Sequence, residues 1–382
     1  MPESWPSGPI KLLVMQATPF CNIDCKYCYL PNRNSKGTMY SRVVEKTIQR
    51  LTEANLIEDK LRILWHAGEP LVAGIQFYRN AISQVQANLP SNVSLTNSLQ
   101  TNALLLNNDW CKFFIEAGIE VGVSIDGPAH LHDAQRVDRR GQSTHRHVEA
   151  GIMLMKENNV PIRTITVLTD TNVDHPVEVF EYLMGIGADS CCFNVDEIQG
   201  VRTQTSLTSE DAYTKVKTFF SVFYDRWMAN DRPFSVREFT SAMSAIKDFD
   251  PNARSIRRKS QQTTPFQVLT VGIDGSFSTF SPELLNAEIE RYGSFNFGNL
   301  LESPLKTAFE SASFIDAYRD MRLGINLCRE TCDYFGICGG GIPANKAFEH
   351  GTLNSAETIH CRLHIQAPFD VIAEEVGKQI GN

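Results

Sequence analysis

The stretch "KLLVMQATPFCNIDCKYCYL", residues 11–30, joins a short apolar run to three cysteines within eight positions. The run "KLLVMQ" predicts a buried strand, and Cys21, Cys25 and Cys28 follow it with the spacing C-x3-C-x2-C. Thiolate clusters select zinc or iron–sulfur centres, and structural zinc sites close on four ligands. Because no fourth ligand lies nearby, the pattern indicates a cluster held by three thiolates with one metal position left open.

Strand and helix signals alternate from this stretch to about residue 235. The strands expected after "KLLVMQ" are the β-rich runs "LRILWH", "VSLTNSLQT", "EVGVSID", "IRTITVL" and "SCCFNV". Segments of helical period lie between or after them, for example "SRVVEKTIQRLTEANL", "VEVFEYLMGIG" and "SEDAYTKVKTFFSVFYDRWM". Six β/α units in series predict an α/β fold with a parallel sheet, either an open barrel or a doubly wound sheet. In such folds the chemistry lies at the carboxyl ends of the strands, where the three cysteines fall.

The pattern changes after about residue 235. "DFDPNARSIRRKSQQTTP" predicts a polar linker, and "FQVLTVGIDGSFSTFSP" predicts a hairpin that turns on Asp274-Gly275. A loop-rich segment with four more cysteines follows, and "APFDVIAEEVGKQI" predicts a closing helix. We therefore expect a first domain at residues 1–235, a linker at 236–264 and a smaller domain at 265–382.

Composition narrows the function classes. The 382 residues carry a net charge of −8, which argues against a nucleic-acid partner because phosphate binding needs a basic surface. No apolar run is long enough to span a membrane, and the start "MPESWPSGP" lacks the basic residues of a signal peptide. These features predict a cytoplasmic protein. In a reducing compartment, clustered cysteines indicate metal binding or catalysis rather than disulfides.

Three further motifs follow the expected strands in order. "WHAGEP" follows the second strand, "QTNALLL" the third and "SIDGPAHLHDAQR" the fourth, and the aromatic Tyr27 precedes the third cysteine. Together with the C-x3-C-x2-C run, these motifs resemble those of the radical S-adenosylmethionine (radical SAM) superfamily over roughly residues 10–200. "WHAGEP" is similar to the family's G-G-E-P, with Ala67 in place of the first glycine.

The resemblance implies a partial (β/α)6 barrel and a radical mechanism. The three cysteines would hold a 4Fe–4S cluster whose open iron binds SAM, and an electron donor such as flavodoxin or ferredoxin would reduce it. One electron then breaks a C–S bond of SAM and gives a 5′-deoxyadenosyl radical, which abstracts hydrogen from the substrate. The residues that the resemblance assigns to SAM are Gly68 and Glu69 for the amino group, Ser124 for the ribose, Arg136 for the carboxylate, and Tyr27 and Asn102 in the same motifs.

The C-terminal cysteines form a second set. Cys328, Cys332, Cys338 and Cys361 have the spacings x3, x5 and x22, and four thiolates in a glycine-rich loop suit zinc or a 4Fe–4S cluster. The segment resembles the SPASM domain of radical SAM enzymes that modify peptides, which carries two auxiliary clusters. Ile342 stands where a further cysteine is expected, and the missing positions all belong to the first of these clusters. The resemblance therefore implies one auxiliary 4Fe–4S cluster in a small loop-rich domain, with a structural zinc as the alternative.

Further motifs point to a subfamily. "HDAQRVDRRGQSTH", "FSTFSPELL" and "CGGGIPANKAFEHG" resemble the maturases of the glycine-rich-repeat peptide system (GRRM-type). Members of that group act on ribosomally made precursor peptides and join an aromatic ring carbon to the β-carbon of a residue two positions later, which forms a cyclophane. Two other enzyme classes share the architecture: anaerobic sulfatase maturases, which make formylglycine, and thioether-forming peptide maturases. A non-enzymatic alternative is an inactive SAM-fold adaptor that presents peptides, although the intact cysteines argue against it.

Cyclophane closure must also release a proton, and the sequence does not single out the base. Acidic residues at strand ends or in the hairpin segment are candidates, namely Asp126, Glu197 and Glu283. Little sequence precedes the first strand, so we expect the precursor peptide to be recognised by the SPASM-like surface, the linker or a separate protein.

Overall fold

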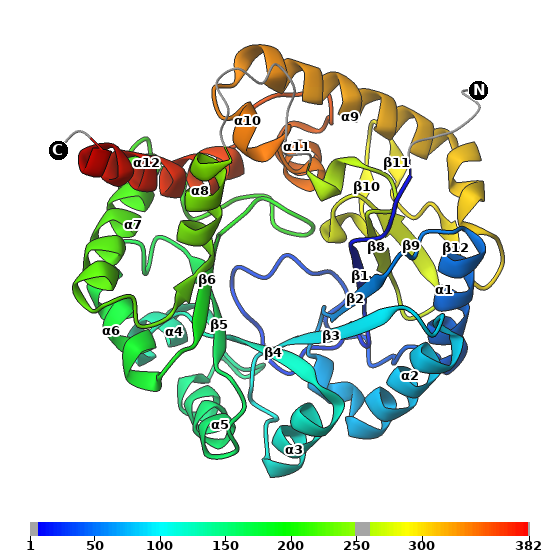
Figure 1. Cartoon of the computed structure of the whole chain (residues 1–382), viewed down its shortest axis with the longest axis horizontal. Helices are drawn as coiled ribbons and strands as arrows, with labels where there is room; N and C mark the ends of the chain where they lie inside the picture. Colours follow the sequence, from blue (N-terminus) through cyan, green and yellow to red (C-terminus); the bar gives the residue numbers. More distant parts are fainter. Residues whose placement is uncertain (1–6, 249–259, 381–382) are drawn as a thin grey trace.

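A sheet of ten strands curves around the centre of the molecule, and helices cover its outer face (Figure 1). The computed structural model describes residues 7–248 and 260–380. The strand order is β12-β9-β8-β1-β2-β3-β4-β5-β6-β7, and the pairs from β8 to β7 are parallel. The order has two ends, so the barrel is open. The strands are β1 Leu12–Met15, β2 Lys60–Trp65, β3 Ser94–Thr101, β4 Ile119–Ser124, β5 Arg163–Leu168, β6 Ser190–Val195, β7 Ser235–Val236, β8 Val268–Val271, β9 Ser276–Thr279 and β12 Gly298–Asn299, with β10 Glu288–Ile289 and β11 Gly293–Ser294 in a separate pair.

Helices connect the strands on the outside, as parallel pairing requires. They are α1 Ser41–Glu53, α2 Ile75–Asn88, α3 Asn108–Ala117, α4 Ala129–Gln135, α5 His145–Glu157, α6 Pro176–Ile186, α7 Ala212–Ala229, α8 Arg237–Lys247, α9 Ala312–Thr331, α10 Phe335–Cys338, α11 Pro343–His350 and α12 Ala367–Ile380. Local sequence sets their ends: the Asn107 side chain accepts from Trp110 N–H at the start of α3, and α6 ends on Gly187 in the left-handed region. The six predicted strands and the α/β fold are confirmed.

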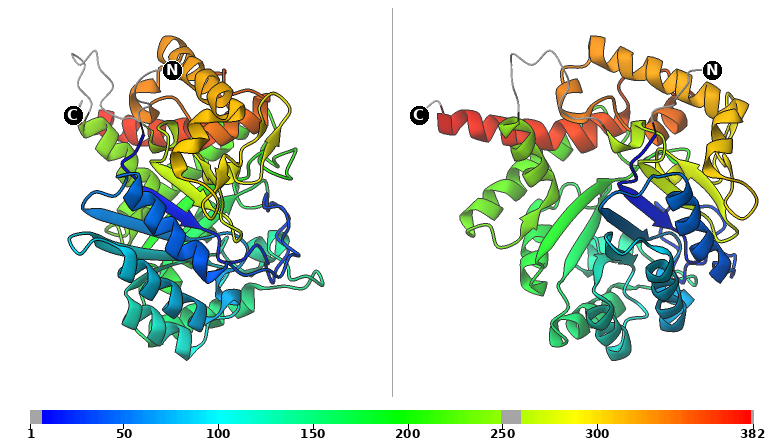
Figure 2. Two further views of the ribbon diagram at one scale, coloured as in Figure 1. Left: turned by 90° about the vertical axis from the view of Figure 1, so that its right-hand side faces the viewer. Right: turned by 45° about the vertical axis from the view of Figure 1, so that its right-hand side comes forward.

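The C-terminal part of the chain extends the same sheet. β8 pairs in parallel with β1, and β9 returns antiparallel to β8, so the predicted hairpin is confirmed. Its turn needs the positive φ of +90° that Gly275 adopts. Figure 2 shows α9 to α12, coloured orange to red, gathered on one side of the barrel, and α12 packs against α7 and α8.

The linker prediction for residues 236–264 is wrong at its start. Residues 237–247 form α8, whose side chains Phe239, Ala242 and Ala245 are buried, and the helix packs on β6 and α12. Residues 249–259 lie outside the described part of the chain. The division into two domains remains a proposal. Within the two described stretches, no helix has the length and apolar character needed to cross a membrane.

Candidate active site at the carboxyl ends of the strands

The three N-terminal cysteines lie in the loop after β1, and they line one cavity of about 330 Å³. The loop is fastened to the segment that ends α4, because Lys26 N–H donates to the carbonyl of Gln135. The guanidinium of Arg139 also donates to the carbonyl of Cys21 at 2.7 Å. We call this space the cluster cavity.

All six residues predicted to contact SAM line the cluster cavity. Five of them lie at the ends of the first four strands or in the loops that follow these strands, as the topology of parallel strands predicts, and the sixth follows α4. The set is Tyr27, Gly68, Glu69, Asn102, Ser124 and Arg136. The structure brings these side chains to one place, and the atom of SAM that each would contact stays a prediction.

The thiols fit an iron–sulfur cluster. Burial raises the pKa of Cys21 to about 11 and that of Cys25 to about 12, because a free thiolate is poorly solvated there. A coordinating metal ion, in contrast, deprotonates a thiol outright. Asn102 Nδ2 lies 3.8 Å from Cys21 Sγ, an N–H···S contact of the kind that tunes such clusters. Among the described residues, no three cysteine sulfurs lie within 4.8 Å of one another, whereas tetrahedral zinc would hold them about 3.8 Å apart.

Glu69 is held by three donors at the end of β2. Its carboxylate accepts hydrogen bonds from Leu71 N–H, Thr101 Oγ1 and Asn102 N–H, at 2.7 to 3.0 Å. Burial raises the pKa of Glu69 to about 7, and these three donors oppose the shift. The side chain therefore ties the loop after β2 to the end of β3, next to the cysteines.

Gly68 occupies a position that excludes a side chain. Its φ is +58°, and an added Cβ would lie 2.5 Å from the carbonyl oxygens of both Phe20 and Thr18. We expect Gly68→Ala to destabilise the protein by about 1–3 kcal/mol more than Gly74→Ala, because overpacking adds to the backbone strain. Gly74 also has positive φ, at +81°, but open space around it. Chemical denaturation of both variants measures the difference, and equal losses of stability would contradict the close packing at Gly68.

Asp126 and Arg136 form a buried ion pair at the end of β4. Arg136 Nε and Nη2 donate to the two carboxylate oxygens of Asp126 at 2.9 and 3.1 Å, and their residues are only 6% and 1% exposed. Tyr27 OH and Val167 N–H donate to the same carboxylate at 2.7 and 3.0 Å. Burial favours the neutral acid, but the charge of Arg136 prevails and lowers the pKa of Asp126. The guanidinium also lies 5.3 Å from the centre of the Tyr27 ring.

This pair bears on the predicted role of Arg136. The two nitrogens that would grip the carboxylate of SAM side-on are engaged by Asp126. Arg136 lines the cluster cavity nonetheless, so its contact with SAM stays a prediction. What the structure adds is that Arg136 and Asp126 fix Tyr27, the neighbour of Cys28.

The second cysteine set gathers around a small cavity formed by α9, α10 and the segment before α12. Cys328, Cys332, Cys338 and Cys361 all line it. Lys346, which is 2% exposed, places Nζ 3.2 Å from Cys328 Sγ. Thr358 Oγ1 lies 3.1 Å from Cys361 Sγ. Donors aimed at sulfur suit a metal centre held by thiolates, and the choice between an iron–sulfur cluster and zinc stays a prediction.

Sequence reasoning missed three residues that support these sites. Lys346 and Thr358 carry no motif that would reveal their contacts with sulfur. Gln100 stands in the quoted "QTNALLL" motif, and its side-chain amide donates to Ser124 Oγ at 2.9 Å. Both residues line the cluster cavity. Gly122 leaves room for that amide, since an added Cβ would lie 2.2 Å from it.

Comparison with known proteins identifies the family. The model of the Radical SAM superfamily matches residues 15–183. An uncharacterised protein of Synechocystis sp. is 34% identical over 378 residues, which cover 98% of this chain and 94% of that protein. The serine-type anaerobic sulfatase-maturating enzyme of Bacteroides thetaiotaomicron is 32% identical over 366 residues, 88% of this chain and 83% of that enzyme.

Solved structures share the fold. Native anSMEcpe with bound AdoMet and the Cp18Cys peptide has a TM-score of 0.76 at 24% identity, covering 97% of this chain and 99% of that one. Streptococcus suis SuiB bound to the precursor peptide SuiA has a TM-score of 0.61 at 13% identity, covering 92% and 76%. The first likeness extends through the C-terminal domain. With its cysteine motif at the end of β1 and relatives along its whole length, the chain belongs to the radical SAM superfamily.

Proposed function

We propose that this chain is a radical SAM peptide maturase that joins an aromatic ring carbon to a β-carbon of a ribosomally made precursor peptide. The observation that carries the proposal is a second cavity of about 490 Å³, the substrate cavity, next to the cluster cavity. The two cavities share wall residues, among them Tyr29, His66 and Glu283. A peptide side chain in the substrate cavity would therefore face the site assigned to SAM.

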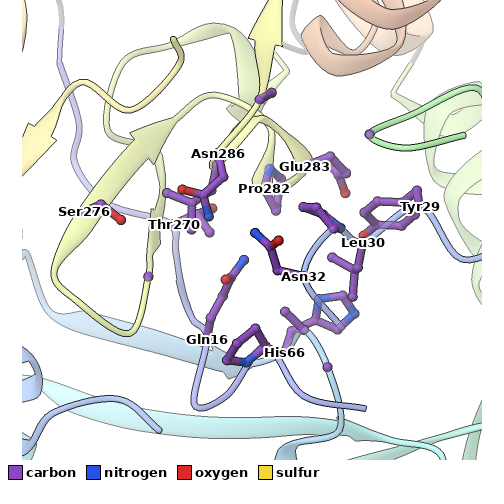
Figure 3. A pocket seen from close by; sticks show the side chains of 18 of the residues that line it. Gln16, Tyr29, Leu30, Asn32, His66, Thr270, Ser276, Pro282, Glu283 and Asn286 are labelled. Carbon is purple, nitrogen blue, oxygen red and sulfur yellow. The ribbon is translucent and has the colours of Figure 1, made fainter. Parts of the chain in front are cut away.

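The lining of the substrate cavity suits a peptide. Figure 3 shows Gln16, Asn32 and Asn286 around the space, and such amides can both donate to and accept from a peptide backbone. Tyr29 and several apolar side chains complete the wall and would pack on an aromatic ring. No lysine or arginine is among the described residues that line it.

The relatives support a peptide substrate. The names of the Bacteroides enzyme and of the two solved structures describe a sulfatase-maturating enzyme, a bound Cp18Cys peptide and a bound precursor peptide. All three act on or bind a polypeptide. This chain shares the fold of the two solved structures and is 32% identical to the Bacteroides enzyme over 366 residues.

When bound, the reduced cluster and SAM would supply the radical that takes hydrogen from the β-carbon. Cys21, Cys25 and Cys28 would hold this cluster, and the four C-terminal cysteines would hold one auxiliary cluster as an acceptor for the second electron. The chain itself supplies the position of the peptide and the exclusion of water.

Formylglycine formation is the second candidate. The identity with sulfatase-maturating enzymes over 88% of the chain favours it. The C-terminal cysteines favour cyclophane formation, because the chain lacks the cysteines that the resemblance to the SPASM domain assigns to the first auxiliary cluster.

The product separates the two. We expect the enzyme, SAM and a reductant to convert a glycine-rich precursor peptide that contains aromatic residues into a product that lacks two hydrogens per crosslink. Tandem mass spectrometry should show a gap in backbone cleavage next to an aromatic residue, because a crosslink keeps the fragments joined. A complete fragment ladder with a hydrazine-reactive residue would contradict the proposal and favour formylglycine.

A further inference from the structure

The turn after β9 places an acidic side chain between the two cavities. Glu283 lies in the short 3₁₀ turn Pro282–Leu284 and lines both the cluster cavity and the substrate cavity. Figure 3 shows its carboxylate next to Tyr29. The turn is anchored at Ser281, whose hydroxyl accepts from Ala344 N–H at 3.1 Å. A rigid base of this kind is what proton transfer to a bound substrate requires.

Asp126 is the first of the other acidic candidates, and its surroundings exclude it. Its carboxylate is saturated by Arg136, Tyr27 and Val167. It is also absent from the described residues that line either cavity. A proton on the substrate could not reach it.

Glu197 lines the cluster cavity but is occupied. Gln199 Nε2 and Asn345 Nδ2 donate to its carboxylate at 2.6 and 2.7 Å, and His360 Nδ1 lies 3.3 Å away. Burial favours the neutral acid, but His360 prevails and lowers the pKa of Glu197. These contacts make Glu197 a poor proton acceptor.

Glu283 has the opposite surroundings. Within residues 7–248 and 260–380, no side chain or backbone donor of another residue bonds to its carboxylate. The groups that face it are Glu197 at the end of β6, His360 before α12 and Tyr29 in the cysteine loop. Burial raises the pKa of Glu283 to about 7, the charge of Glu197 adds to the shift, and His360 opposes it. A base whose pKa lies near the working pH is deprotonated in a large share of the molecules and still binds a proton strongly enough to remove it from the substrate.

We propose that Glu283 is the catalytic base of the crosslinking reaction, an inference that rests on the proposed function. In the loaded enzyme, the radical that SAM supplies would take a hydrogen atom from the substrate β-carbon, and that carbon would bond to a ring carbon. The ring carbon would then give its proton to the Glu283 carboxylate and one electron to an iron–sulfur cluster held by the cysteines, which would restore the aromatic ring. Atoms and electrons balance over the two hydrogens removed.

The test compares Glu283→Gln with Glu290→Gln, whose side chain is exposed and is not among the described residues that line either cavity. The probe is a glycine-rich precursor peptide that contains aromatic residues, with deuterium on the β-carbons. Glu283→Gln should still transfer deuterium to 5′-deoxyadenosine while crosslinked product falls about 100-fold or more. Glu290→Gln should make product like the wild type.

Each other outcome is informative. Crosslinking at the wild-type rate, or loss of deuterium transfer as well, would overturn the assignment of Glu283. If the wild type forms formylglycine instead, the proposed function fails. In that case Glu283 remains the proposed base only if Glu283→Gln fails to form formylglycine and still transfers deuterium to 5′-deoxyadenosine.

A second readout needs no cofactor. The folded-state pKa of Glu283 lies above its unfolded value, so the folded protein binds more protons between about pH 4.5 and 7, and stability falls as pH rises through that window. Glu283→Gln should therefore raise the midpoint of thermal unfolding at pH 8 and leave it unchanged at pH 4. Equal midpoints for both proteins at pH 8 would overturn the proposal that a carboxylate is held there ready for a proton.

Discussion

Simultaneous replacement of Cys21, Cys25 and Cys28 by Ala should leave about four irons per reconstituted chain, compared with about eight in the wild type. The three thiols are the only cysteines among the described residues that line the cluster cavity, so the variant keeps no thiolate to hold that cluster. Cleavage of SAM should be abolished. Iron and sulfide analysis after anaerobic reconstitution measures the first effect, and 5′-deoxyadenosine formation measures the second.

Cys192→Ala is the matched control. Cys192 is half-buried on β6, its sulfur contacts the carbonyl of Thr164, and it lines neither cysteine site. This variant should keep about eight irons and full SAM cleavage. A wild-type protein with about four irons and one tightly bound zinc would show that the C-terminal set is a zinc site, while leaving the assignment of the N-terminal set intact.

The repeating units of the barrel could be predicted because their signal is local. Each strand is a short apolar run, and a helix such as α6 carries its own end in Gly187. The carboxyl-end placement of the cysteines follows from parallel topology alone. The cavity-lining set of Gly68, Glu69 and their partners could be predicted because each residue belongs to a motif next to a strand end.

The errors arose where tertiary contacts decide. The stretch from 237 to 247 is polar enough to suggest a linker, but burial of Phe239 against β6 and α12 makes it a helix. Pairing of β8 with β1 joins segments more than two hundred residues apart, which no local pattern reveals. The three acidic candidates look alike in sequence, and only their neighbours separate Glu283 from Asp126 and Glu197.

Arg136→Ala should destabilise the protein by about 3–5 kcal/mol, because it leaves the Asp126 carboxylate buried without its counter-charge. The loss also removes the partner that holds Tyr27 next to Cys28, so the affinity for SAM should fall. Arg140→Ala is the control, since Arg140 is exposed on the following turn and its loss should change stability by less than about 0.5 kcal/mol. Chemical denaturation measures the first effect, and equilibrium binding of SAM to the reconstituted protein measures the second.

Asp126→Asn then separates the two roles of Arg136. It breaks the same ion pair but leaves the guanidinium in place. Both variants should therefore lose stability, while only Arg136→Ala would remove the predicted contact with SAM. Affinity that falls much further in Arg136→Ala than in Asp126→Asn would support the predicted contact with the carboxylate of SAM. Equal affinities in the two variants would show that Arg136 acts only by holding Asp126 and Tyr27. Unchanged stability in both would contradict the ion pair itself, since a buried carboxylate cannot lose its partner without cost.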